Sequence, residues 1–132
     1  MLTTKDTRST KEDEVARAIV DAAFMVHRTL GPGLLESVYE KCLAAELIER
    51  GYSVEVQKQI PIAYRNLRID AGFRADLLVE SCVLVELKAV ESLLDLHTAQ
   101  VLTYLKLTGL HLGLLINFNT SLLKHGIKRL VF

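Results

Sequence analysis

The segment CVLVELKAV, residues 82–90, predicts a strand in the middle of a sheet. Seven of its nine residues are apolar, which is typical of a strand covered on both faces. Glu86 and Lys88 interrupt the apolar run, and their spacing of two residues places both side chains on the same face. Burying unpaired charges there would cost several kcal/mol. A bound metal cation would relieve that cost, and exposure of this end of the strand would explain the charges equally well.

A second acidic residue, Asp76, lies in the preceding apolar segment FRADLLVE, residues 73–80. The two segments together predict a hairpin. A two-residue turn would leave Glu86 on the opposite face from Asp76, whereas a three-residue turn over residues 80–82 would pair the two carboxylates directly. We therefore predict the longer turn, or an equivalent bulge.

The three residues Asp76, Glu86 and Lys88 suggest metal-assisted chemistry. Carboxylates on paired strand positions have Cβ atoms about 4.5–5.5 Å apart and repel each other unless a cation lies between them. Mg²⁺ or Mn²⁺ suits such oxygen ligands. The ion would polarise a phosphoryl oxygen and lower the pKa of a bound water, and Lys88 could hold that water and balance charge. This set suits hydrolysis of a phosphodiester, although the spacing does not identify which one.

Helical patterns flank the hairpin in the sequence. Ser9 and Glu12 fit a capping box at the start of a helix that Gly31-Pro32-Gly33 ends. A second helix is expected over residues 34–50, and a third over residues 95–108. The apolar residues of the second helix that we expect to cover a sheet are Leu35, Val38, Cys42, Ala45 and Leu47.

Further strands are expected on both sides of the hairpin in the sequence. Residues 54–62 contain Ile60-Pro61 and predict an edge strand or a strand end, and residues 65–68 predict a turn. Residues 110–117 and the closing 128–132 complete the set. The resulting order, ααβββαββ, predicts an α/β (α+β) fold with a mixed central β-sheet flanked by helices.

Length and composition favour one globular domain over residues 9–132, preceded by a flexible tail over residues 1–8. No apolar run is long enough for a membrane span, and the polar start does not resemble a signal peptide. We therefore expect a cytoplasmic protein without membrane contact, with Cys42 and Cys82 as reduced thiols. Sixteen basic and sixteen acidic residues argue against coating of nucleic acid by bulk charge, although a locally basic groove would be compatible with them.

Five motifs follow one another in the order GLLESVY, RADLLVE, VELKAVE, HTAQVLTYLKLTG and GLLINF. In this order they resemble the GxxExxY family, a small branch of the PD-(D/E)XK nuclease superfamily. The resemblance covers about residues 15–132. It implies a restriction-endonuclease-like core and a nuclease activity that depends on a divalent metal.

The resemblance also implies roles for single residues. Asp76 corresponds to the first acidic position, and Glu86 and Lys88 correspond to the (D/E)xK motif. Glu36 corresponds to the helical glutamate that assists metal binding or orients water. Gln100 and Tyr104 are similar to a helical Q…Y motif that supports the site or touches substrate. Ala75 stands where the superfamily name has a proline, a position that is often replaced.

The helical residues also have interpretations that do not depend on the family. Glu36 would favour the dipole of its helix start, and Tyr104 would be a core aromatic. His97 could bind phosphate or carry a proton, or lie exposed, whereas Tyr39 is expected to pack between helix and sheet. Five basic residues could contact phosphates, although solvated surface charge is the safer interpretation of each: His27, Arg28, Arg65, Arg68 and Arg74.

The leading functional hypothesis is a magnesium-dependent nuclease that acts on DNA rather than RNA, with a homodimer as a plausible assembly. One alternative is a binding or regulatory module that keeps the fold without turnover. A plain structural domain with exposed charges is the other. Retention of Asp76, Glu86, Lys88 and Gln100 favours the enzyme.

Overall fold

The computed structural model describes residues 10–132. Two helices come first, α2 (Lys11–Leu30) and α3 (Glu36–Glu49). Three strands follow, β1 (Val54–Tyr64), β2 (Leu67–Val79) and β3 (Val83–Lys88). The chain continues through α4 (Asp95–Thr108), β4 (Leu112–Asn117), the short 3₁₀ helix η1 (Leu123–Gly126) and β5 (Ile127–Val131). The predicted order ααβββαββ is confirmed, with η1 as an unforeseen addition.

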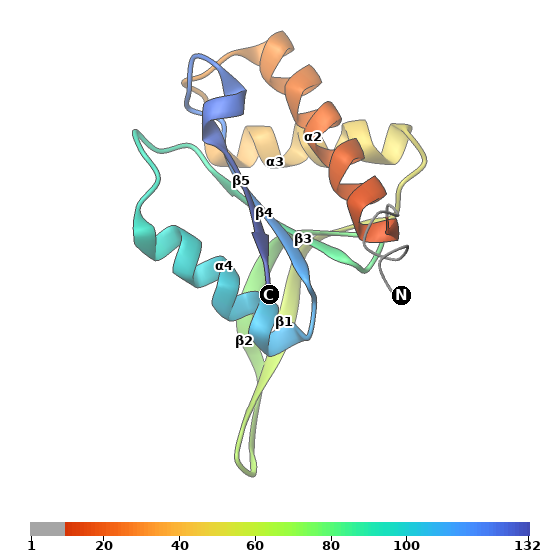
Figure 1. The fold of residues 1–132 in the computed structure, drawn as a ribbon, viewed down its shortest axis with the longest axis vertical. Helices are drawn as coiled ribbons and strands as arrows, with labels where there is room; N and C mark the ends of the chain where they lie inside the picture. The colour runs from red at the N-terminus through yellow and green to blue at the C-terminus, as the bar shows by residue number, and fades with distance from the viewer. Residues whose placement is uncertain (1–9) are drawn as a thin grey trace, which may run out of the picture.

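The five strands form one sheet in the order β1-β2-β3-β4-β5. Neighbours are antiparallel except for β3 and β4, which are parallel and are connected through α4 (Figure 1). A parallel pair needs a crossover connection, usually a helix. The sheet is therefore mixed, as the sequence predicts, and β3 lies at its centre.

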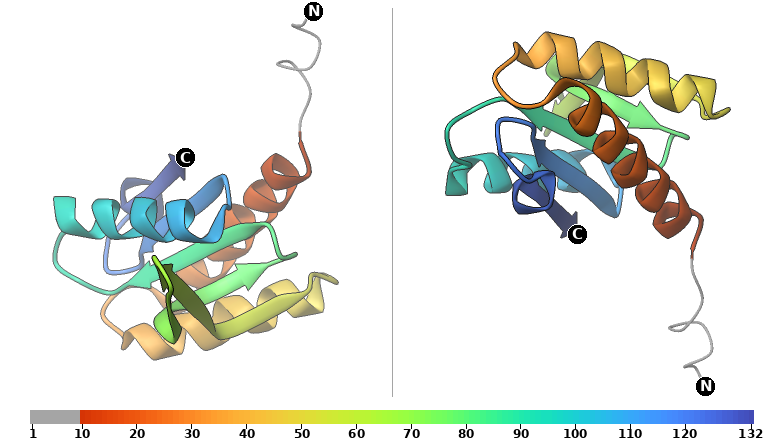
Figure 2. Two further views of the ribbon diagram at one scale, coloured as in Figure 1. Left: turned by 90° about the horizontal axis from the view of Figure 1, so that it is seen from below. Right: turned by 90° about the horizontal axis from the view of Figure 1, so that it is seen from above.

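Helices cover both faces of this sheet. Figure 2 shows α4 on the opposite side of the sheet from α3. The larger core joins α2 and α3 to one face, with Ile19, Tyr39 and Leu87 among its fully buried members. The smaller core places Val101 and Leu105 of α4 against the other face. Within residues 10–132, no helix combines the length and the apolar character that crossing a membrane requires.

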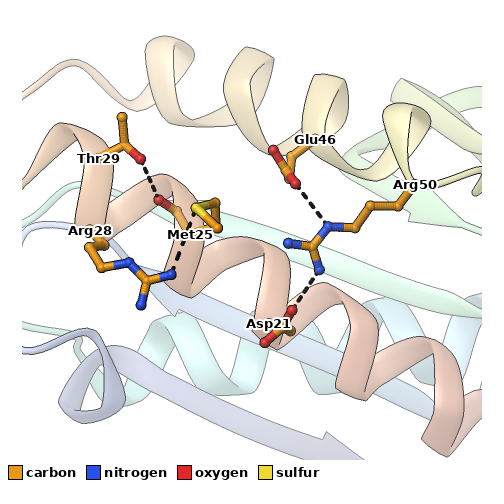
Figure 3. A network of polar contacts seen from close by, with 6 residues as sticks. All are labelled: Asp21, Met25, Arg28, Thr29, Glu46 and Arg50. Atoms are coloured by element: carbon orange, nitrogen blue, oxygen red, sulfur yellow. Dashed lines mark hydrogen bonds and ion pairs between the residues drawn. The ribbon is translucent and has the colours of Figure 1, made fainter.

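The two N-terminal helices are also joined by polar contacts. Arg50 follows α3 and donates to Glu46 of the same helix at 2.8 Å and to Asp21 of α2 at 2.7 Å (Figure 3). Because Asp21 is largely exposed, this ion pair adds little stability by itself. It does fix the end of α3 relative to α2, and α3 contributes residues to the site described below.

Two predictions about the helices need correction. The capping box is formed by Thr10 and Asp13, which exchange hydrogen bonds of 3.0 and 3.2 Å. The expected cap Ser9 and the expected tail over residues 1–8 lie outside the described residues. In α3 the predicted buried face is right for Leu47, which is fully buried, and for Cys42, which packs against the core, but it is wrong for Leu35, which is 73 % exposed, and for Ala45, which is also exposed. The residues that face the core are Tyr39, Leu43, Ala44 and Leu47.

Strands β1 and β2 extend beyond the sheet as a two-stranded ribbon (Figure 1). We call residues 61–72 the arm, because every one of them except Ile62 is exposed. Pro61 lies in the edge strand β1, as predicted, and the pairing register shifts beside it. Gly72 lies at this irregularity, where a Cβ would come within 2.2 Å of the Ile62 side chain. The arm is therefore longer than the sequence predicts, and the close approach of Ile62 at this irregularity favours a glycine at position 72.

Candidate metal and active site

The β2–β3 hairpin has the longer of the two turns considered. Val79 pairs with Val83 and Leu77 pairs with Val85, so three residues connect the strands. Glu80 and Ser81 have φ values of 52° and 55°, and the Cys82 N–H donates to the Val79 carbonyl at 3.0 Å. Continuing the same register places Asp76 opposite Glu86. The predicted three-residue turn is therefore confirmed.

Backbone pairing between β2 and β3 stops just where these two acidic residues begin. The last paired residues are Leu77 and Val85. Beyond them the Asp76 N–H donates to Glu86 Oε1 at 3.2 Å, and the Leu87 N–H donates to Asp76 Oδ2 at 2.8 Å. Each carboxylate thus accepts a backbone N–H from the neighbouring strand. These bonds fix both side chains at the point where β2 and β3 separate.

The carboxyl group of Glu86 is in an environment that disfavours its charge. Its side chain is buried, with the residue only 6 % exposed. Burial, followed by the negative charge of Asp76, raises the pKa of Glu86 from 4.5 to about 8, and the nearby Lys88 offsets only part of this effect. Without a bound cation the site therefore holds a proton at neutral pH. A divalent ion between the carboxylates would take the place of that proton.

Helix α3 brings two further carboxylates to the same place. Glu36 is the first residue of the helix, and Glu40 lies one turn later on the same side. Burial raises the pKa of Glu36, and Asp76 raises it further while Lys88 lowers it. Burial likewise raises the pKa of Glu40, a residue that our sequence reasoning missed. The carboxyl groups of Glu36, Glu40, Asp76 and Glu86 therefore share one region, and the positive charge of Lys88 acts on two of them, Glu36 and Glu86.

Gln57 of β1 is the second residue that sequence reasoning missed. Its Nε2 donates to Glu40 Oε2 at 2.6 Å and to Asp76 Oδ1 at 3.1 Å. The pairs on either side, Val56 with Leu77 and Lys58 with Ala75, place Gln57 opposite Asp76. A glutamine in a partly alternating strand carries no local signal of such a role. The long-range pairing of β1 with β2 is what brings it to the site.

Lys88 lies at the end of β3, which β4 holds in place. The Phe118 N–H donates to the Lys88 carbonyl at 2.9 Å. Asn117, which pairs with Lys88 in the parallel register, accepts from the Val90 N–H at 3.0 Å and donates to the Val90 carbonyl at 2.9 Å. Lys88 forms no ion pair with any carboxylate of residues 10–132. Its ammonium is therefore close enough to act on Glu36 and Glu86 electrostatically but is not bound to either.

Helix α4 contributes Tyr104 to the border of this region. The Tyr104 ring stacks on Phe73 with centroids 3.9 Å apart. Burial raises the pKa of its hydroxyl, and the charges of Glu86 and Asp76 add to the effect. Gln100, one turn earlier in α4, is exposed and makes no hydrogen bond within the described part of the chain. The expected Q…Y pair therefore has only its tyrosine beside the carboxylates in this structure.

His97 and Tyr39 form hydrogen bonds with backbone groups near them in the chain. The His97 Nδ1 accepts from the Leu94 N–H at 3.0 Å at the start of α4. Tyr39 is fully buried and stacks on Phe118 with centroids 4.6 Å apart. Its hydroxyl donates to the Gly31 carbonyl at 2.6 Å and accepts from the Leu34 N–H at 3.1 Å. The predicted packing of Tyr39 between helix and sheet is confirmed, and it holds the loop that precedes Glu36.

The donor set fits a hard divalent cation that keeps part of its water shell. Among residues 10–132 no group of three His, Cys, Asp or Glu side chains is arranged to hold a metal by itself. Mg²⁺ commonly binds through one or two carboxylates together with waters and substrate phosphates. The opposed Asp76 and Glu86 supply such a pair, and the accumulated negative charge around them favours a cation.

Residues 13–130 match the family model described as PD-(D/E)XK nuclease superfamily. The match spans most of the chain and agrees with the predicted restriction-endonuclease-like core. No curated protein and no solved structure matches the chain. The narrower resemblance to the GxxExxY branch stays a prediction.

Proposed function

The chain belongs to the PD-(D/E)XK nuclease superfamily, and from this membership we infer that it hydrolyses phosphodiester bonds with the help of a divalent cation. The observation that carries the proposal is the opposed pair Asp76 and Glu86, linked by the 3.2 and 2.8 Å bonds at the end of the β2–β3 ladder. Two carboxylates held together in a partly buried place, where Lys88 offsets only part of the effect of burial and of their mutual repulsion, favour cation binding.

We propose that Asp76 and Glu86 bind Mg²⁺ or Mn²⁺ and that Glu36 assists them. Such an ion would polarise a phosphoryl oxygen of the substrate and lower the pKa of a bound water. Lys88 would orient the attacking water and balance negative charge that develops on the phosphate. Glu36 would hold the water from the α3 side, where the charges of Asp76 and Lys88 act on its carboxyl.

The remaining predicted residues have supporting roles in this proposal. The Tyr104 hydroxyl borders the carboxylates and would contact the scissile phosphate or its sugar. Gln100 is exposed one turn away on α4, where it would contact the nucleic acid. Tyr39 would position the start of α3, and His97 the start of α4.

DNA is the favoured substrate because of the shape and charge of the arm. The arm and the two residues that follow it, 61–74, contain Arg65, Arg68 and Arg74, which we call the arm arginines, and a single acidic residue, Asp70, which pairs with Arg68 at 3.0 Å. The major groove of B-form DNA admits a two-stranded ribbon, whereas the deep and narrow major groove of RNA does not. Tyr64, at the tip, is 63 % exposed and could stack on a base.

A homodimer is the assembly we propose, because one face of the arm is apolar. Ile62 pairs with Ile69 and Tyr64 pairs with Leu67 across the ribbon. Leu67 is 59 % and Ile69 44 % exposed, and exposed apolar patches commonly mark protein interfaces. A second copy could cover Ile62, Leu67 and Ile69 of this face, while Tyr64 at the tip and the arm arginines remain free to contact DNA. We also keep the prediction of a cytoplasmic location, which the free thiols Cys42 and Cys82 support.

The test is a cleavage assay on labelled single-stranded, duplex, flapped and four-way-junction DNA and on RNA. Wild type and Lys88→Ala would be compared in Mg²⁺, in Mn²⁺ and in chelator. We expect metal-dependent cutting by the wild type and its loss in Lys88→Ala without loss of metal binding. A folded wild-type protein that binds these substrates and never cuts them would instead support the alternative function, a non-catalytic or partner-dependent module on the same fold.

A further inference from the structure

Gln57 combines an unusual backbone with an unusual side-chain position. It has φ 52°, although it is not glycine and lies within strand β1. Residues other than glycine rarely adopt this left-handed conformation, and where they do the surrounding structure must stabilise it. The three other non-glycine residues with positive φ, Arg65, Glu80 and Ser81, lie in the turns that follow β1 and β2. Gln57 alone among these four lies beside the carboxylates.

The side chain of Gln57 makes the contacts that this backbone conformation permits. Its amide nitrogen carries two hydrogens, and it donates to Glu40 Oε2 and to Asp76 Oδ1. Glu40 comes from α3 and Asp76 from β2, so one amide joins three elements of the fold. The amide is neutral, and its donors are shared between two acidic groups that would otherwise repel each other.

The two oxygens of Asp76 are thereby held from opposite sides. Oδ2 accepts from the Leu87 N–H at 2.8 Å and Oδ1 accepts from Gln57 at 3.1 Å. A carboxylate held at both oxygens has a fixed plane, so its remaining lone pairs point in fixed directions. Outer residues that orient a metal ligand in this way commonly change metal affinity by 10- to 100-fold when they are removed.

We propose that Gln57 is a positioning residue that orients the Asp76 carboxylate for metal binding and links it to Glu40 of α3. The part of this inference that concerns metal binding rests on the proposed function. Orientation of Asp76 by Gln57 is a property of the metal-free protein and can be tested separately. A purely structural role is the competing explanation, in which Gln57 matters only because it stabilises the fold.

A pair of variants separates the two explanations. Gln57→Ala and Gln57→Gly both remove the amide, but only glycine adopts φ 52° without strain. We expect Gln57→Gly to melt a few degrees above Gln57→Ala, while both lose roughly 10- to 100-fold in Mn²⁺ affinity measured by calorimetry. Gln57→Asn keeps an amide and tolerates this backbone but is one methylene shorter, so its affinity should also fall. Affinity that follows melting temperature, with Gln57→Gly close to wild type, would overturn the proposal.

Ser81 provides the matched control, because its φ of 55° is similar and it lies in the β2–β3 turn. Ser81→Gly should also melt above Ser81→Ala, and neither variant should change the affinity for Mn²⁺. A loss of affinity in the Ser81 variants as large as in the Gln57 variants would show that the assay reports general loosening of the hairpin, and would count against the proposal.

Hydrogen exchange of the Leu87 amide tests the orientation of Asp76 without any metal. Losing Gln57 should free Asp76 and speed exchange of this N–H by roughly tenfold, the factor that corresponds to about one hydrogen bond. The Phe118 N–H, which donates to the Lys88 carbonyl, should be unchanged. Unchanged exchange at Leu87 overturns the inference even if the wild type binds metal. Accelerated exchange in a protein that binds no metal would support the orientation of Asp76 and overturn the proposed metal site alone.

Discussion

Replacing Glu86 with glutamine should remove a large pH dependence from the stability of the metal-free protein. The folded pKa of Glu86 is raised from 4.5 to about 8 by burial and by Asp76. Below about pH 4.5 the carboxyl is protonated in both the folded and the unfolded chain, so its effect on stability is absent. Between about pH 4.5 and pH 8 only the unfolded chain is ionised, so the free energy of unfolding falls as pH rises.

The size of this effect follows from the shift. A difference of about 3.5 units at about 1.36 kcal/mol per unit gives roughly 5 kcal/mol as the upper bound of the destabilisation, complete above pH 8. A domain of this size has a total stability of about 5–15 kcal/mol. Ionisation of Glu86 should therefore remove a substantial share of the stability of the metal-free protein in mild alkali. Glutamine has the shape of the protonated carboxyl and does not ionise, so Glu86→Gln should keep its stability.

The assay is chemical unfolding in chelator from pH 5 to pH 9, followed by circular dichroism. Wild type and Glu86→Gln should agree near pH 5 and diverge steadily to pH 8. Glu49→Gln, at the exposed end of α3, controls for the removal of one surface charge. Added Mg²⁺ or Mn²⁺ should stabilise the wild type more at pH 8 than at pH 5, since the cation replaces a proton. Parallel curves for wild type and Glu86→Gln in chelator would refute the reasoning.

Three other changes should have separate effects. Tyr39→Phe removes only a hydroxyl that bridges two backbone groups, and should cost about 1–3 kcal/mol in unfolding free energy while the ring stack persists. Asn117→Ala leaves the Val90 N–H without its partner, although the Val90 carbonyl still accepts from Asn119 Nδ2 at 3.3 Å, and should cost a similar amount and also lower the cleavage rate; a variant with full stability and full rate would contradict this. Replacing the three arm arginines with alanine should weaken DNA binding and reduce its salt dependence, by roughly one unit of slope for each lost phosphate contact. Lys124→Ala with Lys128→Ala, far along the chain and exposed, is the control for general charge and should leave the salt slope unchanged.

Local patterns in the sequence were sufficient for the order of elements and for the position of Asp76 against Glu86. The hairpin register could be predicted because a two-residue turn and a three-residue turn place Glu86 on opposite faces of the sheet. Only the three-residue turn places it on the same face as Asp76. Helix α4 was predicted with its observed bounds because Gly109 ends it clearly. The start of α2 was misplaced by one residue because Thr10 and Asp13 satisfy the capping pattern as well as Ser9 and Glu12 do.

Other features depend on contacts that no local pattern shows. Apolar residues occur all around α3, so spacing alone identified Leu47 but not Leu43 and Ala44 as part of its buried side. Glu40 could have been found, because it lies one turn from Glu36 on the same side of the helix. Gln57 could not, because its role depends on the pairing of β1 with β2 and on a φ that propensities do not favour for glutamine.

The three-residue connection between β2 and β3 has a consequence for how this chain can change in length. One residue removed from positions 80–82 would leave both strands intact but would turn Glu86 and Lys88 to the opposite face of the sheet from Asp76, since side chains alternate along a strand. Residues added to or removed from the exposed tip of the arm would leave that alternation untouched. Insertions and deletions that accumulate among descendants of this sequence should therefore gather in the arm, whereas the distance along the chain from Asp76 to Lys88 stays constant.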